Sequence, residues 1–511
     1  MLLGRMNRRQ FLERTSLGAA LLTAGPPLNS LAGAGEENTR APKQEPYKYR
    51  IAFGAWLNDL RMSPLPLENW PAPQFDDESV ESAIRAMDVQ AEAGFDRLDV
   101  WGLFATYGWP PDIVSALEPD RKRRIQKLLA AAGQRGIKIM LGLGTYSWGY
   151  DKILVADPEV RGKNADGSPH AHALCDANPK SFEYVKRIID FALGEFNFGG
   201  VHLESCDLGC CCCPQCAGKD SVVGYNVRIN QKAADYIKKR WPDKIVYVIT
   251  INWSPAGKHF DAGQKAKVVE LSRHIDCVFD QGHAGYHIAE GERRDFIKQL
   301  SCAYGTSGKL WLYPDTRWDR ASYFLPYPRR AGEALKSEYR DGVRGCLFYQ
   351  GPVSNPGQEI MMAFGGRMLS NPARSVDDAL GEVLEKYYKP RTPAAHNRLM
   401  KVIQTAEESY FGQWSAELFG KLWGIPVPGE FKLDQNLFGT SPGPATYLKE
   451  PCLDAKGRKE YRGGLKSVLA ELAQLEGQCD DQGRLATLRR CVTVTLAMLN
   501  TVSYTLGEPI Q

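Results

Sequence analysis

The chain has 511 residues, of which 43% are hydrophobic and 24% charged, with a formal net charge of +4 at pH 7 and a mean hydropathy of -0.36. Residues 1–34 carry +3 of that charge, so the rest of the chain is close to neutral and has no electrostatic basis for binding nucleic acid. After residue 40 no uninterrupted apolar stretch approaches the roughly 18 residues that a membrane-spanning helix needs, so we expect no membrane span.

The first 34 residues have the features of a bacterial twin-arginine export signal. Arg8 and Arg9 precede a weakly apolar stretch, and the small residues at 32–34 suit cleavage. Such a signal is an address read by a receptor and does not anchor the protein in the membrane. We therefore expect residues 1–34 to be a signal peptide, residues 35–48 to be a linker, and the mature protein to be periplasmic or secreted.

Eight short apolar runs alternate with amphipathic stretches between residues 49 and 370. The runs expected to be strands cover 49–56, 97–103, 137–148, 200–205, 245–253, 276–282, 309–318 and 344–351. Several of the amphipathic stretches end in a glycine-containing turn just before the next run, as helices commonly do. Eight β–α units of this kind predict an α/β protein with a (β/α)8 TIM barrel at 49–370. A doubly wound open sheet is the alternative, but no glycine-rich phosphate-binding turn follows the first run.

The pattern becomes helical after residue 370. The segment 371–390 reads NPARSVDDALGEVLEKYYKP, and helical spacing of apolar residues recurs in the later parts of the chain. We therefore expect residues 371–511 to form a C-terminal α-helical domain that packs on the barrel.

Carboxylic acids occur near the ends of several expected strands, where the catalytic groups of TIM barrels lie. Glu204 is near the end of the fourth run, Asp280 is in the sixth, and Asp315 is in the seventh. Two carboxyl groups that face each other can cleave a glycosidic bond, because one protonates the leaving oxygen while the other acts as nucleophile or activates water. We expect Glu204 to be the catalytic acid and Asp315 to be the second carboxylate, with Asp280 as its competitor.

Aromatic and other polar residues accompany these acids, and aromatic rings suit the apolar faces of sugar rings, although they are also common packing residues. The residues expected to bind substrate are Trp56, Asp99, Trp101, Tyr146, Trp148, His202, Asn252, Trp253, His283, Arg317, Trp318 and Gln350. His202 shares a strand face with Glu204 because side chains alternate along a strand, so it could instead support Glu204 from beneath. Asp99 could likewise be a structural partner of Arg97.

Residues 200–216 read GVHLESCDLGCCCCPQC and contain six of the thirteen cysteines. Zinc needs four ligands arranged as a tetrahedron, and thiolates of one tight loop can supply them. Disulfides are the alternative interpretation, although adjacent cysteines rarely pair because the geometry is strained. We expect Cys206, Cys211, Cys213 and Cys216 to bind a structural zinc ion or to form disulfides, and catalysis to need no cofactor.

The carboxylate after the fourth run, the cysteine loop beside it and the tail beginning at residue 371 resemble the alpha-glucuronidase-like glycoside hydrolases. The resemblance is strongest to bacterial relatives that carry a CxCPxC stretch, here Cys211 to Cys216. It implies a general acid at Glu204 and a base from a later strand, at Asp315 or Asp280. Near the seventh run only Asp315 and Asp319 are acidic, which departs from the acidic pair of that group.

Together these features predict an exported glycoside hydrolase that acts on an extracellular polysaccharide or oligosaccharide. The alternatives are a polysaccharide lyase and a glycan-binding barrel without catalytic activity.

Overall fold

The structure is a computed structural model of the chain. It describes residues 44–53, 75–101, 103–104, 108–147, 149–205, 209–217, 222–250, 261–280, 290–291, 293–307, 324–349, 353, 355–412 and 455–508. Lys43–Gln511 form one compact unit. The expected signal peptide lies outside the described residues, as does the linker up to residue 43.

Eight parallel strands close into a barrel in the order β1-β10-β9-β8-β7-β6-β3-β2. The strands are β1 (Tyr49–Phe53), β2 (Arg97–Val100), β3 (Lys138–Thr145), β6 (Gly200–Ser205), β7 (Ile245–Ile249), β8 (Cys277–Asp280), β9 (Ala303–Ser307) and β10 (Gly345–Tyr349). This order follows the chain around the ring, as successive β–α units require. The predicted TIM barrel is confirmed, and the open sheet is excluded.

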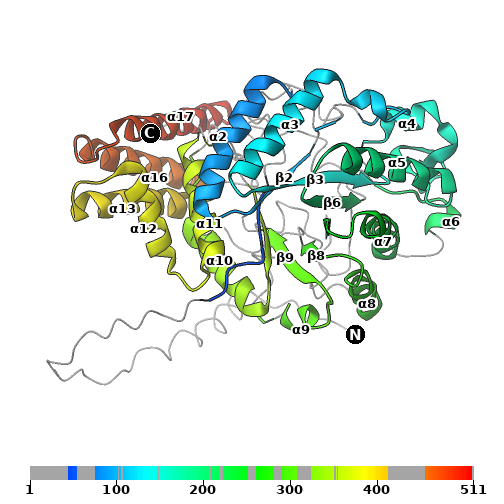
Figure 1. The fold of residues 1–511 in the computed structure, drawn as a ribbon. Helices are drawn as coiled ribbons and strands as arrows, with labels where there is room; N and C mark the ends of the chain where they lie inside the picture. The colour runs from blue at the N-terminus through cyan, green and yellow to red at the C-terminus, as the bar shows by residue number, and fades with distance from the viewer. Residues whose placement is uncertain are drawn as a thin grey trace, which may run out of the picture. The chain divides into compact units, whose positions relative to one another are not determined.

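Helices surround the ring of strands (Figure 1). The elements that belong to the barrel layer or its loops are α2 (Asp77–Ala93), η2 (Val114–Ala116), α3 (Pro119–Gln134), α4 (Asp151–Ala156), η3 (Pro158–Val160), α5 (Pro179–Glu195), α6 (Pro214–Ala217), α7 (Val222–Arg240), α8 (Ala262–Leu271), α9 (Arg294–Ile297), α10 (Pro328–Asp341) and α11 (Pro356–Ser370). Helix α2 shows how local sequence sets their limits. The Asp76 side chain accepts a hydrogen bond from the Ser79 backbone N–H at its start, and Gly94 with φ of 99° ends it.

The loop between β3 and α5 contains a small antiparallel hairpin. Its strands are β4 (Arg161–Lys163) and β5 (Pro169–Leu174). The Leu174 N–H donates to the Tyr146 carbonyl oxygen at 2.7 Å, which joins the hairpin to the segment that follows β3. The loop after β3 is therefore an ordered subdomain beside the barrel.

The seventh strand lies earlier in the chain than the sequence pattern indicates. The run 309–318 lies outside the described residues, and β9 consists of Ala303–Ser307 with the sequence AYGTS. This segment has one large apolar residue and a central glycine, so it lacks the usual composition of a buried strand. Gly305 is needed there because a Cβ atom would lie 2.2 Å from the Phe279 ring. Asp315 therefore does not lie on the described part of this strand.

In the described part of the chain after residue 370, four helices follow the barrel, namely α12 (Val376–Tyr388), α13 (Pro393–Phe411), α16 (Ala455–Gln474) and α17 (Gln482–Thr505). They contact the barrel unit through hydrogen bonds as well as apolar packing. The Phe324 N–H donates to Thr495 Oγ1 at 2.7 Å, and the Tyr461 hydroxyl donates to the Phe324 carbonyl oxygen at 2.9 Å. Within the described part of the chain, none of the helices has the length and apolar character needed to span a membrane.

Candidate functional site

Glu204 lies at the carboxyl end of β6, one residue before the strand ends. The residue is 8% exposed, so its side chain is largely buried. The next residue, Ser205, faces α7, where its hydroxyl accepts a hydrogen bond from Asn230 at 2.8 Å and donates to Asn226. These bonds fix the end of β6 against the helix layer and hold Glu204 at the end of the barrel where TIM-barrel active sites are built.

Three buried side chains lie beneath Glu204 inside the barrel. Asp99 Oδ2 accepts hydrogen bonds from His202 Nδ1, at 2.7 Å, and from the Tyr247 hydroxyl. Asp99 comes from β2 and Tyr247 from β7, and these strands are not neighbours in the ring, so their hydrogen bond crosses the barrel interior. On its other side, His202 Nε2 lies 3.6 Å from Glu204 Oε2. The four side chains therefore form a continuous polar chain from the interior to the strand end.

Burial sets the protonation state of the innermost member of this chain. Desolvation, reinforced by the Asp99 carboxylate, raises the pKa of Tyr247 well above its usual value. Tyr247 therefore keeps its proton, and its hydroxyl donates a hydrogen bond to Asp99 Oδ2. Since Asp99 also accepts from His202 Nδ1, Nε2 is the ring nitrogen of His202 that faces Glu204.

Aromatic rings hold the imidazole of His202 in place. Its ring lies edge-on to Trp101 with centroids 4.9 Å apart, and it stacks on Tyr247 with centroids 5.1 Å apart. Gly142 of β3 makes room for this arrangement, because a Cβ atom there would lie 2.2 Å from the Trp101 ring. The position of His202 is thus fixed by packing as well as by its bond to Asp99.

Four residues expected to bind substrate are buried, with exposures of 0% for Asp99 and His202, 2% for Trp101 and 1% for Tyr146. Asp99 and His202 belong to the polar chain beneath Glu204, and Trp101 packs against His202. Tyr146 lies beside Asp176, whose carboxylate adds to burial in raising the pKa of the Tyr146 phenol. Tyr247, which the sequence reasoning did not select, has no distinguishing signal because it sits in an ordinary apolar run.

Asp280 faces away from the barrel interior. It pairs in register with Thr306 of β9, and the Thr306 hydroxyl donates to Glu338 of helix α10. Paired residues of parallel strands point to the same side of a sheet, so Asp280 also points to the helix layer. There its Oδ2 accepts a hydrogen bond from the Tyr304 hydroxyl at 2.5 Å. The structure does not bring Asp280 together with Glu204, which favours another residue as the second carboxylate.

Ten other expected site residues lie outside the described residues. These are Trp56, Trp148, Cys206, Asn252, Trp253, His283, Asp315, Arg317, Trp318 and Gln350. Their roles stay predictions.

Comparison with models of protein families finds no match, and neither does comparison with curated proteins. Among solved structures, a GH138 enzyme targeting pectin rhamnogalacturonan II is similar, with a TM-score of 0.56 and 11% identity. The match covers 90% of this chain but only 58% of that enzyme. A mutant of the O-GlcNAc hydrolase of Thermobaculum terrenum has a TM-score of 0.50 and 10% identity, over 90% of this chain and 85% of that one.

The chain shares the fold of these TIM-barrel glycoside hydrolases. At identities this low the likeness shows the fold alone. Neither structure is named as an alpha-glucuronidase, so the resemblance to that group stays a prediction.

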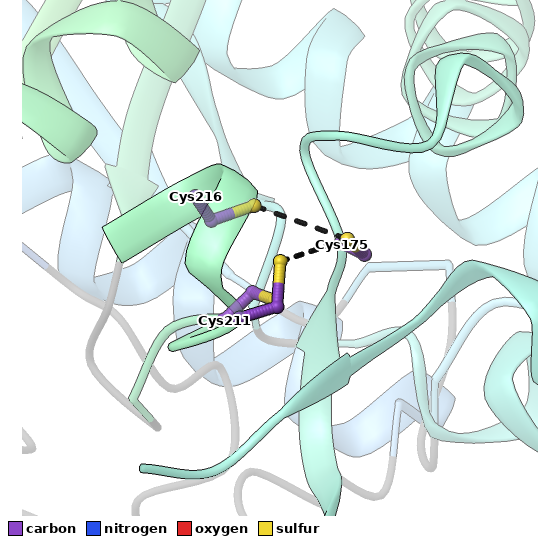
Figure 2. A group of neighbouring side chains, drawn as sticks. Cys175, Cys211 and Cys216 are labelled. Carbon is purple, nitrogen blue, oxygen red and sulfur yellow. Dashed lines mark hydrogen bonds between the residues drawn. The ribbon is translucent and has the colours of Figure 1, made fainter. Parts of the chain in front are cut away.

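A second group of chemically reactive side chains lies in the loops next to β6. The sulfur atoms of Cys175, Cys211, Cys213 and Cys216 all lie within 4.8 Å of one another, and all four residues are free thiols. Figure 2 shows Cys175 facing Cys211 and Cys216 from a separate segment of the chain. The expected set contained Cys206, which lies outside the described residues, and did not contain Cys175. Cys175 follows the β4–β5 hairpin, and only the fold brings it to the cysteine loop.

Proposed function

We propose that the chain is a glycoside hydrolase in which Glu204 is the general acid. The observation that carries this proposal is the polar chain beneath Glu204, in which Tyr247, Asp99 and His202 are wholly buried and lead to one carboxyl group at the barrel end. Burying four polar side chains in a barrel core is costly, so a core of this kind suits a functional role better than a purely structural one. The shared fold with glycoside hydrolases supports the same proposal.

The geometry suggests how the acid works. With Asp99 bound to Nδ1 of His202, Nε2 is the ring nitrogen that lies beside Glu204 Oε2, at 3.6 Å, so the buried imidazole positions this carboxyl group from beneath. Glu204 then gives its proton to the glycosidic oxygen as the bond to the sugar breaks. A second carboxylate, which we propose to be Asp315, attacks the sugar or activates the water that does so.

We also propose, from the twin-arginine pattern at residues 1–34, that the enzyme is exported and acts on an external polysaccharide or oligosaccharide. The carbohydrate is then its main partner. The chemistry described here needs no cofactor.

The decisive experiment compares the mature wild type with Glu204→Gln on uronate-containing, fucosylated and neutral glycans, with analysis of the products. We expect the substitution to lower kcat/KM by about 100- to 10,000-fold, because it removes proton donation to the leaving group. Glu476→Gln is the control, since Glu476 is exposed and lies among the C-terminal helices. Equal activity of wild type and Glu204→Gln would overturn the assignment.

Analysis of the products also distinguishes a hydrolase from the two alternatives, a polysaccharide lyase and a glycan-binding barrel. A polysaccharide lyase leaves an unsaturated sugar that absorbs in the ultraviolet, whereas a hydrolase does not. A glycan-binding barrel gives no products at all, and its Glu204→Gln variant keeps the affinity of the wild type.

A further inference from the structure

We propose that Cys175, Cys211, Cys213 and Cys216 bind one structural zinc ion that joins two loops at the carboxyl end of the barrel. This site is separate from the polar chain around Glu204. The proposal of a zinc site does not depend on the proposed hydrolase activity.

The spacing of the sulfur atoms is that of a tetrahedral metal site. Zinc–sulfur bonds of about 2.3 Å place neighbouring thiolates of a tetrahedron about 3.8 Å apart. Cys175 Sγ lies 3.8 Å from Cys213 Sγ and 3.8 Å from Cys216 Sγ. A disulfide needs a separation of about 2 Å, so these thiols are arranged around a common centre and not in bonded pairs.

Backbone N–H groups surround the sulfur atoms. The Lys163 N–H donates to Cys211 Sγ at 3.4 Å, and the Cys213 N–H also faces that sulfur. The Ala177 N–H faces the sulfur atoms of Cys175 and Cys216. Four thiolates and one Zn²⁺ leave a net charge of −2, and hydrogen bonds from N–H groups stabilise such a charge in a buried site. The backbone is therefore arranged for thiolate ligands.

The cluster joins segments that follow two different strands. Cys175 comes after the β4–β5 hairpin of the β3 loop, and the other three cysteines come from the loop after β6 and from α6 (Figure 2). The Cys212 N–H donates to the Lys163 carbonyl oxygen at 2.7 Å. At Gly162 a Cβ atom would lie 2.9 Å from the Ala173 carbonyl oxygen and 3.0 Å from Cys211 Cβ, so glycine is needed for the two segments to pack this closely.

Helix α7 fixes the Cys175 segment from the other side. Asp176 accepts hydrogen bonds from Arg228 at 2.9 Å and from Lys232 at 2.6 Å. The same helix holds Ser205, the residue after Glu204. A zinc ion at the cluster would therefore stiffen the loops on the side of the barrel that carries Glu204.

The ligand set favours a structural role for the metal. Catalytic zinc sites have three protein ligands and leave one position for water or substrate, whereas four cysteines close the tetrahedron. Cys211, Cys213 and Cys216 are buried, with exposures of 1%, 8% and 1%. The site thus offers no coordination position to a substrate.

Metal analysis of the purified full-length mature protein tests the proposal. We expect one zinc ion per chain in the wild type and loss of that zinc in Cys175→Ser. Cys212→Ser is the matched control, because Cys212 lies between two proposed ligands but bonds to the Cys210 carbonyl oxygen and is not in the cluster. Full zinc content in Cys175→Ser, or a wild type that contains iron or no metal, would overturn the proposal.

A second measurement needs no variant, so it does not depend on folding of Cys175→Ser. The native wild type is treated with a thiol-alkylating reagent, with and without a strong chelator, and each cysteine is followed by peptide mass spectrometry. We expect Cys175, Cys211, Cys213 and Cys216 to be protected from alkylation until the chelator removes the metal. The alkylation rates of all four should then rise together, by at least tenfold. Protection that only a reductant removes would show disulfides, and reactivity without chelator would show bare thiols, so either result contradicts a zinc site.

Discussion

A single oxygen atom of Asp99 organises the proposed active site. Asp99 Oδ2 accepts two hydrogen bonds, one from His202 Nδ1 and one from the Tyr247 hydroxyl. Because a carboxylate oxygen only accepts, the bond to His202 places a proton on Nδ1. His202 Nε2 has no hydrogen-bond partner among the described residues and is 3.6 Å from the Glu204 carboxyl group. His202 and Asp99 are wholly buried, so in the proposed mechanism they act on a substrate only through Glu204, as positioning residues.

Asp99→Asn tests this arrangement at the level of one residue. The amide keeps the size of the side chain but weakens the charged hydrogen bond to His202, which is worth about 1.5–3 kcal/mol. We expect kcat/KM to fall about 10- to 100-fold and the basic limb of the pH–rate profile, which reports deprotonation of the general acid, to move, with KM almost unchanged. Tyr247→Phe keeps Asp99 and His202 and should cause a smaller loss of the same kind. Unfolding curves of both variants show whether a purely structural effect explains the loss, and an unaltered pH profile would contradict the positioning role.

At the level of elements, helix α10 meets strand β9 through a buried carboxyl group. Glu338 is 0% exposed and accepts a hydrogen bond from the Thr306 hydroxyl. Burial raises the pKa of Glu338 from 4.5 to about 7, although the charge of Arg293 lowers it in part. The folded protein therefore holds this proton at pH values where the unfolded chain has released it.

This shift has a definite consequence for stability. Because the folded-state pKa is raised, the contribution of Glu338 is most favourable below pH 4.5 and is lost as the pH rises towards 7. The loss amounts to at most about 3 kcal/mol in the free energy of unfolding. Glu338→Gln cannot ionise, so its stability relative to the wild type should increase between pH 5 and pH 8. Urea unfolding at both pH values measures this difference, and parallel pH dependences of the two proteins would refute it.

The sequence predicts seven of the eight strands at their observed places, because their apolar runs are long and end in turns. It misses β9 because Ala303–Ser307 has one large apolar residue, and Gly305, which leaves room for the Phe279 ring, adds no apolar signal. Glu204 and His202 are foreseen from strand alternation, since both lie on β6. Tyr247 and Cys175 are not, because their partners come from other strands or loops, and only the closed barrel brings them together.

At the level of the whole molecule, the C-terminal helices pack on the barrel and contribute contacts to its helix layer. Tyr327, at the start of α10, caps no N–H group of that helix with its side chain. Glu407 of α13 does so instead, since its carboxylate accepts from the N–H of Arg329 at 3.1 Å and of Arg330 at 2.9 Å. A negative charge at the amino end of a helix is also favourable for its dipole. The sequence pattern changes at residue 370, but buried contacts join the parts of the chain on the two sides of this predicted boundary.

Glu407→Ala tests whether the two parts unfold together. The substitution leaves two helix N–H groups in a buried place without their acceptors and removes packing volume, so we expect a loss of about 2–4 kcal/mol in the free energy of unfolding. Glu408→Ala is the matched control, because the Glu408 side chain is 69% exposed and its ion pair with Arg330 should contribute at most about 1 kcal/mol.

Denaturant unfolding is followed by tryptophan fluorescence and by circular dichroism. We expect one transition that moves to lower denaturant in both signals, since α13 stabilises a helix of the barrel. A separate early transition in Glu407→Ala, with the main transition unmoved, would show that the barrel folds without the C-terminal helices.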